Sequence, residues 1–165
     1  WVPKMGGKTD VIPTRTNRMW LKADEAGEFL GQCAELCGIA HGYMKLRVYA
    51  QSPTDFQSWV EEQKATASLP PQSDPAYRPL TTLCTACHTI QGTTLQGVQG
   101  PDLTHFGSRN TLAAGILENT EETLKSWLRD PDALKRGTQM AAVIKKGVLN
   151  EEQIDALAAY LLSLK

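Results

Sequence analysis

The sequence predicts two small domains, an incomplete β-domain followed by an all-α domain. Short apolar segments separated by Pro and Gly turn residues fill residues 1–50. Residues 67–77 are small, polar and proline-rich, which is typical of a semi-rigid linker. Beyond them, helix-capping residues precede apolar residues at helical spacing. We therefore place the domains at 1–66 and 78–165, with 67–77 as the linker.

The composition is that of an ordinary globular protein, with 41% hydrophobic and 21% charged residues among 165. A formal charge of −1 gives no reason to expect nucleic acid or an anionic membrane surface as partner. No apolar run reaches the roughly 18 residues that a membrane-spanning helix needs. The chain opens on Trp1 and has no signal peptide, so we expect it to be the C-terminal portion of a longer protein.

The first half reads as three or four strands and one helix. Met19–Ala23 is a strand candidate, residues 27–31 lead into a cysteine-containing stretch, and Leu46–Ala50 alternates as a half-buried strand does. Three or four strands bury too little surface to be stable alone. We therefore expect this to be the end of a β-domain whose first strands are missing from the sequence. Ser52 is a capping residue for a helix that runs to about Lys64.

The second half reads as helices separated by loops. Short helices are expected over Pro79–His88 and Thr111–Leu117, with a Gly-rich loop over 91–107 between them. Thr120 is a good N-cap for Glu121–Arg129, which Asp130-Pro131 ends. The last helix begins with a capping box, Asn150 and Gln153, and carries one apolar stripe formed by Ile154, Leu157, Ala158, Leu161 and Leu162.

All four cysteines fall into two clusters, and the second is Cys84-Thr85-Ala86-Cys87-His88. Two structural disulfides in an exported protein are the simplest interpretation, but they leave the histidines and methionine beside the cysteines unexplained. The C-x-x-C-H spacing is typical of covalent c-type haem attachment, because the two thiols can reach both vinyl groups of one haem. The following imidazole then lies beneath the iron as its proximal ligand.

A second axial ligand should come from far along the chain. Met140 is the only methionine of the second half, and it lies in a Gly-containing loop between two predicted helices. A single Met is often core filler, and His105 is the competing ligand. We favour Met140 as the iron ligand.

Residues 78–165 resemble a class I cytochrome c in several separate motifs. The matching pieces are Cys84-x-x-Cys87-His88, Gly100-Pro101-x-Leu103, Thr123-Leu124-x-x-Trp127-Leu128-x-x-Pro131, Gly137-Thr138-x-Met140 and the final helix. The resemblance implies that the carbonyl of Pro101 orients the ring of His88. It also implies that Trp127 lines the methionine side of the haem. For Arg109 two interpretations stay open, a contact with a haem propionate and an ordinary surface arginine.

The first cluster places Cys33, Cys37, His41 and Met44 within twelve residues, a donor set that suits copper. A zinc site would leave Met44 without a role. A mononuclear blue-copper site would leave one thiolate over. A pair of copper ions bridged by both thiolates would use every donor.

The pattern C-x-E-x-C-G-x-x-H-x-x-M resembles the dinuclear copper loop of cytochrome c oxidase subunit II, and the similarity extends over residues 1–50. It implies a cupredoxin-like Greek-key β-barrel in which Cys33 and Cys37 bridge two coppers. His41 and Met44 would be terminal ligands. Glu35 would supply its backbone carbonyl, and its carboxylate would reach a magnesium ion at the subunit interface. The family's other histidine ligand lies before Trp1, so this chain would carry one of two copper imidazoles.

Together the two resemblances imply an electron-transfer subunit of a terminal respiratory oxidase. An upstream quinol-oxidising complex or small cytochrome would reduce the fused haem c, and electrons would pass through the copper pair to the oxygen-reducing subunit I. The chain would lie on the outer, periplasmic or extracellular face of a bacterial cytoplasmic membrane, held there by upstream helices. Alternatives are the electron-entry part of a nitric oxide or nitrous oxide reductase, and a standalone electron carrier or redox sensor.

Overall fold

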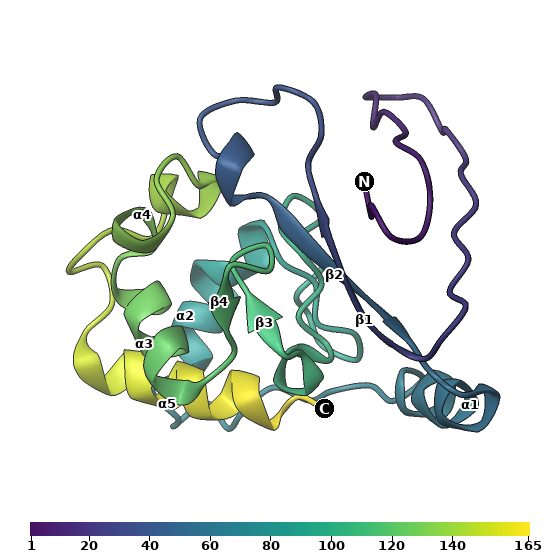
Figure 1. Ribbon diagram of the computed structural model, residues 1–165. Coiled ribbons are helices and arrows are strands. Elements are labelled where there is room, and N and C mark those ends of the chain that lie inside the picture. The colour runs from purple at the N-terminus through teal and green to yellow at the C-terminus, as the bar shows by residue number, and fades with distance from the viewer.

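The first β-strands form a two-stranded antiparallel sheet that closes the first cysteine loop. The computed structural model describes all 165 residues, and Figure 1 shows the sheet beside the helical part of the chain. Strand β1 (Gly27–Gln32) pairs with β2 (Lys45–Ala50), so that Gln32 lies opposite Lys45. The amide of Cys33 then donates to the carbonyl of Met44 at 2.9 Å. The loop 33–44 therefore begins and ends at adjacent points of one sheet.

The 26 residues before β1 contain no helix or strand, so the prediction of a strand at Met19–Ala23 is wrong. Residues Met19–Ala23 make one backbone hydrogen bond, from Lys22 to the carbonyl of Met5 at 3.3 Å, and Trp20 is 88% exposed. A strand needs a partner along its whole length, and no neighbouring backbone provides one. The β-half has two strands where three or four were expected.

The predicted helix after Ser52 is confirmed as α1 (Pro53–Glu62), with the Ser52 side chain accepting from the amide of Asp55. None of its residues is buried, and Figure 1 shows it at the far end of the sheet from the 33–44 loop. The segment that follows returns to the helical domain. The amide of Ala67 donates to the carbonyl of Gln91 at 2.9 Å, and Ala76 is fully buried.

The second domain is mainly helical but contains one small hairpin. The prediction of a helix over Thr111–Leu117 is wrong, because these residues form a β-hairpin whose turn has positive φ at Ala113, Ala114 and Gly115. Left-handed backbone cannot continue a right-handed helix. The capping predictions at Thr120 and Asn150 are confirmed. The elements are α2 (Tyr77–Thr82), β3 (Thr111–Leu112), β4 (Leu117–Glu118), α3 (Glu121–Arg129), α4 (Pro131–Leu134) and α5 (Glu151–Ser163).

A single hydrophobic core lies within this second domain. Its 16 buried residues all fall between Ala76 and Leu164, and they include the predicted α5 stripe at Ile154, Leu157, Ala158 and Leu161. Such burial supplies most of the stability of a small domain. No helix in the structure has both the length and the apolar character needed to cross a membrane.

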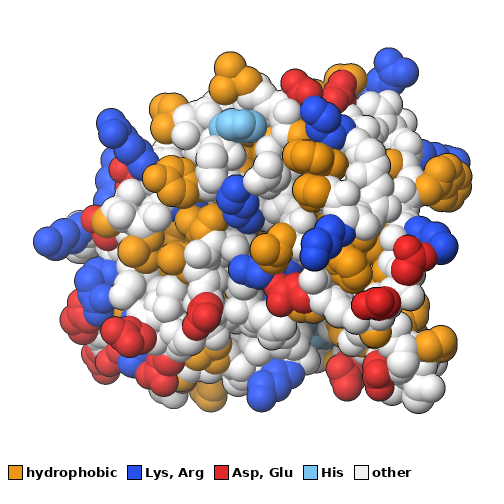
Figure 2. Space-filling view, viewed as in Figure 1, with side chains coloured by type: hydrophobic (Ala, Val, Ile, Leu, Met, Phe, Trp, Pro, Cys, Tyr) orange, Lys and Arg blue, Asp and Glu red, His pale blue; other side chains and the backbone are white.

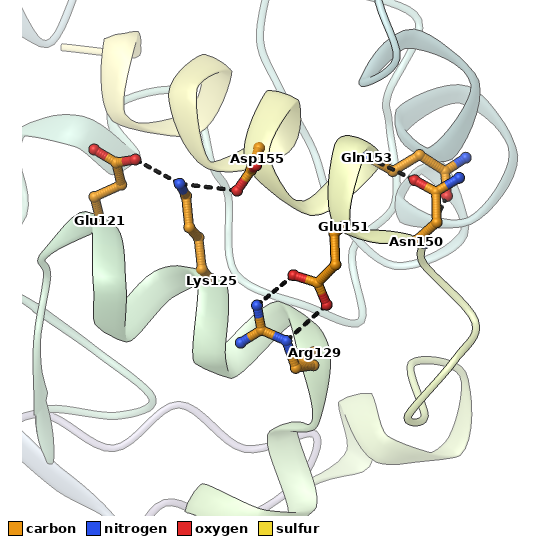
Figure 3. Close-up of polar contacts among 7 residues, drawn as sticks. All are labelled: Glu121, Lys125, Arg129, Asn150, Glu151, Gln153 and Asp155. Carbon is orange, nitrogen blue, oxygen red and sulfur yellow. Dashed lines mark hydrogen bonds and ion pairs between the residues drawn. The ribbon is translucent and has the colours of Figure 1, made fainter.

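Two ion-pair groups join α3 to α5 across the edge of this core. Figure 3 shows Arg129 making two hydrogen bonds to Glu151, and Lys125 lying between Glu121 and Asp155. The side chains are partly exposed, so each pair adds little by itself. Figure 2 shows that acidic and basic side chains intermix over the face in view, with hydrophobic side chains between them.

Candidate functional site

The loop between β1 and β2 gathers five potential metal donors. The Sγ atoms of Cys33 and Cys37 lie 3.3 Å apart, and the carbonyl oxygen of Glu35 is 3.1 Å from Cys33 Sγ. On the other side, Cys37 Sγ is 3.6 Å from His41 Nδ1 and 3.9 Å from Met44 Sδ. The predicted donors of the first cluster are thus brought together, with Cys37 in contact with three of them.

The backbone of this loop explains why the donors converge. Cys33 and Met44 are held opposite each other by the sheet, because the amide of Cys33 donates to the Met44 carbonyl. A 3₁₀ turn over His41–Tyr43 lifts the imidazole back towards the thiols. Gly38 has a φ of 124°, a conformation that side chains rarely adopt, and it lets the chain reverse between Cys37 and His41.

The two thiols are free, and their separation is well beyond the roughly 2.05 Å of a disulfide bond. The hydrogen bond with Cys33 is the main cause of a raised pKa at Cys37, followed by burial. Thiols so close cannot both ionise easily without a cation, and a soft metal ion that binds both replaces their protons. Two thiolates, an imidazole, a thioether and a carbonyl fit copper.

The Glu35 side chain is exposed and makes no hydrogen bond or ion pair, so its predicted magnesium role has no support in its contacts. Its backbone carbonyl, by contrast, points to Cys33. The residue therefore joins the donor set through its main chain.

The second cluster lies at the end of α2, where a 3₁₀ turn over Cys84–Ala86 closes the C-x-x-C-H motif. The amide of His88 donates to the Cys84 carbonyl at 2.9 Å. Burial raises the pKa of the Cys84 thiol to about 11, and Cys87 adds to the effect. A dithiol that exchanges disulfides needs a lowered pKa, so this environment is the opposite of a thiol-redox site.

The ring of His88 is fixed from its Nδ1 side. Nδ1 lies 2.7 Å from the carbonyl oxygen of Pro101, as predicted from the resemblance, and can donate its proton there. Nε2 is then the nitrogen left free to bind iron. An added Cβ on Gly100 would come within 2.6 Å of this ring, so only glycine allows the Gly100–Pro101 backbone to pass so close. The Gly-rich composition of the loop was the sequence signal for this approach.

Trp127 and Met140 meet inside the same domain. The indole Nε1–H of Trp127, in the last turn of α3, donates to Met140 Sδ at 3.2 Å, and both side chains pack against the core. Met140 lies in a 3₁₀ turn over Gln139–Ala142, held by the turn that starts at Gly137. The sulfur predicted as an iron ligand is therefore oriented by one hydrogen bond from the residue predicted to line it. The two contacts, His88 with Pro101 and Trp127 with Met140, each fit a domain that holds a haem.

Arg109 and His105 have other surroundings. The guanidinium of Arg109 donates to the backbone carbonyl of Asp102 and lies 5.8 Å from the Phe106 ring, and burial lowers its pKa. His105 lines a cavity of about 450 Å³ together with linker and α5 residues, including Leu69 and Tyr160. Its two ring nitrogens are buried without a partner. The propionate role of Arg109 stays a prediction.

Two family models match the chain at these two sites. "Cytochrome C oxidase subunit II, periplasmic domain" matches residues 1–51, and "Cytochrome c" matches residues 77–165. The relatives named "Cytochrome c oxidase subunit 2" from Alkalihalophilus pseudofirmus, Bacillus sp. PS3 and Bacillus subtilis are 42%, 39% and 35% identical, each over all of this chain. The alignments cover 47%, 49% and 49% of these relatives, so the chain spans about half of their length.

The matched ranges hold the two donor sets separately. The model of the copper domain ends just after β2, and the model of the haem domain begins with α2. A copper domain and a haem domain thus follow each other in one chain, as the sequence motifs predicted. The chain belongs to the cytochrome c oxidase subunit II family, in the form that carries a C-terminal cytochrome c domain.

Proposed function

We propose that this chain is part of the electron-transfer subunit of a terminal respiratory oxidase. Electrons enter at a covalently bound haem c from a quinol-oxidising complex or a small cytochrome, and leave through a dinuclear copper centre to the oxygen-reducing subunit I. The observation that carries the proposal is the five-donor loop, with two free thiols 3.3 Å apart, in the same chain as a partly buried Trp127–Met140 pair and an oriented His88.

The chain's own residues hold and orient the two cofactors. Cys84 and Cys87 would attach the haem through their sulfurs, and His88 and Met140 would bind its iron. Cys33, Cys37, His41, Met44 and the Glu35 carbonyl would hold the copper pair. When bound, haem and copper each exchange single electrons, and the protein supplies ligation, burial and orientation. Fusion of the domains makes the donor step intramolecular and raises its effective concentration.

The remaining assignments follow from the same proposal. Strands β1 and β2 belong to a cupredoxin-like Greek-key barrel, and a second copper histidine comes from residues before Trp1. Upstream helices anchor the subunit at the outer face of a bacterial cytoplasmic membrane, against subunit I. At that interface the Glu35 carboxylate would be available to a magnesium ion. The domains are residues 1–66 and 78–165, joined by 67–77.

A visible and near-infrared spectrum with metal analysis tests the proposal on the full-length subunit. We expect one low-spin c-type haem and a copper pair in the wild type. Cys37→Ser should abolish the near-infrared copper band and leave the haem spectrum unchanged, because Cys37 lies outside the cytochrome core. Tyr43→Phe, a change in the same loop that removes no predicted donor, is the control. Zinc in place of copper, or copper that survives Cys37→Ser, would overturn the copper assignment.

Purification from the membrane separates the oxidase from the alternatives. A co-purifying large subunit that consumes oxygen supports the terminal oxidase. A partner that reduces nitric or nitrous oxide, or purification without any large membrane subunit, contradicts it.

A further inference from the structure

The copper-donor loop and the Met140 loop touch each other directly. Ile39 lies between the donors Cys37 and His41, and it packs on Gly137, three residues before Met140. A Cβ added to Gly137 would come within 2.9 Å of Ile39 Cγ2 and 3.0 Å of Ile39 Cβ, so Ile39, which is 79% exposed, would have to shift to make room for it. Figure 1 shows the 3₁₀ turn of the donor loop beside α4, just before Gly137 in the chain.

A second contact lies at the other end of the donor loop. Lys45 directly follows the donor Met44, and its amide donates to the carbonyl of Ala114 at 2.9 Å. Ala114 is in the β3–β4 turn, and a Cβ on the next residue, Gly115, would lie 3.2 Å from the Lys45 backbone. The hairpin tip of the cytochrome domain therefore bonds to the first residue of β2 by main-chain atoms alone.

This hairpin tip has an unfavourable backbone conformation. Ala113 and Ala114 have φ values of 55° and 62°, and Gly115 follows at 74°. Left-handed backbone is costly for residues with a side chain, and two such residues in succession persist only where the surroundings impose them. Asn119 and the short strands hold the base of the hairpin, but the tip itself needs a partner.

Lys135 supplies that partner from beneath. It is 9% exposed, makes no ion pair, and donates from Nζ to the carbonyl of Ala113 at 3.3 Å. Lys135 is also two residues before Gly137, whose amide is held by Asp132 Oδ1 at 2.9 Å. One short segment after α4 therefore supports both contacts with the copper domain, the first through Lys135 and the hairpin tip, the second through Gly137.

We propose that Ala113–Gly115 and Gly137 form a docking seam that holds the copper-donor loop at a fixed position against the Met140 loop. Lys135 is the positioning residue of the seam, acting through Ala113. The purpose of the seam, to keep the two redox centres at a constant separation, rests on the proposed function. The docking of the two loops can be measured independently of that function. The seam itself is formed by the main-chain bond from Lys45 to Ala114 and the contact of Ile39 with Gly137, and Lys135 supports it by one hydrogen bond to Ala113.

Gly137→Ala in the full-length subunit carrying both cofactors tests the seam, with Gly147→Ala as its matched control. Both glycines have positive φ, 79° and 87°, but a Cβ on Gly147 meets nothing within 4 Å. The measurement is hydrogen exchange at the Lys45 amide, with the Leu124 amide inside α3 as an internal reference. We expect Gly137→Ala to speed exchange at Lys45 about tenfold, about 1.4 kcal/mol of opening free energy. Equal exchange in the two variants overturns the seam.

Lys135→Met tests the positioning residue, because it keeps the length of the stem and removes the donor. Lys146→Met, at an exposed lysine without a partner, makes the same change elsewhere. Only Lys135→Met should speed exchange at Lys45 and slow haem-to-copper electron transfer after flash photolysis severalfold, with both midpoint potentials unchanged. No change at Lys45, or a shifted haem potential, overturns this role. Slow hydrogen exchange at the Lys45 amide in a wild type whose haem never reduces copper would contradict the proposed function and leave the seam standing.

Discussion

The four cysteines show how neighbouring atoms give one residue type two different environments. Cys37 is exposed and lies against another thiol, an imidazole and a thioether, so its sulfur has several partners at once. Cys84 is held beside the core, where burial raises its pKa to about 11. The first environment suits a metal that displaces protons, and the second suits a sulfur that ends in a neutral thioether.

Trp127→Phe should lower the midpoint potential of the haem. The Nε1–H of Trp127 donates to Met140 Sδ at 3.2 Å and draws electron density from the sulfur. Without it, the thioether donates more strongly to iron and favours the oxidised state. A net hydrogen bond of about 1 kcal/mol corresponds to about 40 mV for one electron. Spectroelectrochemical titration measures the shift.

Trp59→Phe provides the comparison, because Trp59 is 44% exposed on α1 and stacks on Phe56 away from the haem domain. Its potential should equal that of the wild type. An unchanged potential in Trp127→Phe would show that the sulfur of Met140 is not the axial ligand.

Residue spacing was sufficient to predict which side chains of the 33–44 loop come together, but not what positions them. Cys33, Cys37, His41 and Met44 could be identified because ligand chemistry limits which residues serve. Lys135 could not, since a buried lysine under a hairpin carries no sequence signal. Its role depends on left-handed φ at Ala113 and Ala114, a conformation that alanine disfavours intrinsically and that only long-range contacts impose.

The same distinction separates the elements that were predicted correctly from those that were not. Helices α1, α3 and α5 could be predicted because their capping residues bond to nearby residues of the same helix, as Asn150 does with Gln153. The segment 111–117 has helix-favouring composition, yet its hairpin is fixed by contacts with Lys45 and Lys135. Met19–Ala23 was predicted as a strand, but no strand of this chain lies beside it to pair with.

Glu151→Gln should make the cytochrome domain less sensitive to acid. The hydrogen bonds from Arg129 are the main cause of the lowered pKa of Glu151. A carboxylate with a depressed folded pKa contributes stability above its unfolded pKa of about 4.3, and this is lost as pH falls through the folded pKa. Glu151→Gln should therefore lower Tm at pH 6, with the difference from wild type shrinking as the pH falls below about 4.3. Thermal unfolding followed by circular dichroism measures it.

Glu152→Gln isolates the ion pair from the helix dipole. Both acids lie in the first turn of α5, where negative charge is favourable, but Glu152 pairs with no cation. At pH 6 the Tm of Glu152→Gln should fall less below the wild-type value than the Tm of Glu151→Gln does. Equal losses would mean that the dipole, and not Arg129, accounts for the effect.

At the scale of the whole molecule, the buried core that stabilises the chain lies in the haem domain, and the β-half has almost no core of its own. All 16 residues of the core lie between Ala76 and Leu164, whereas residues 1–66 bury only Val2 among their apolar side chains. The β-half is held by one sheet, the contacts of Trp1 with Gln32, and the seam. The seam thus attaches a weakly packed copper loop to a well-packed haem domain.

Trypsin should therefore separate this chain into a digested β-half and a resistant haem domain. Lys64 is exposed, follows the unburied α1, and precedes the point where Ala67 and Ser68 bond to the helical domain. Several basic residues before β1 lie in irregular, exposed backbone, among them Lys8, Arg15 and Arg18. Fragment 65–165 should keep its haem absorbance and unfold in a single transition, because the core remains whole. Mass spectrometry identifies the fragment, and a fragment that loses its helical signal would show that the domains depend on each other for folding.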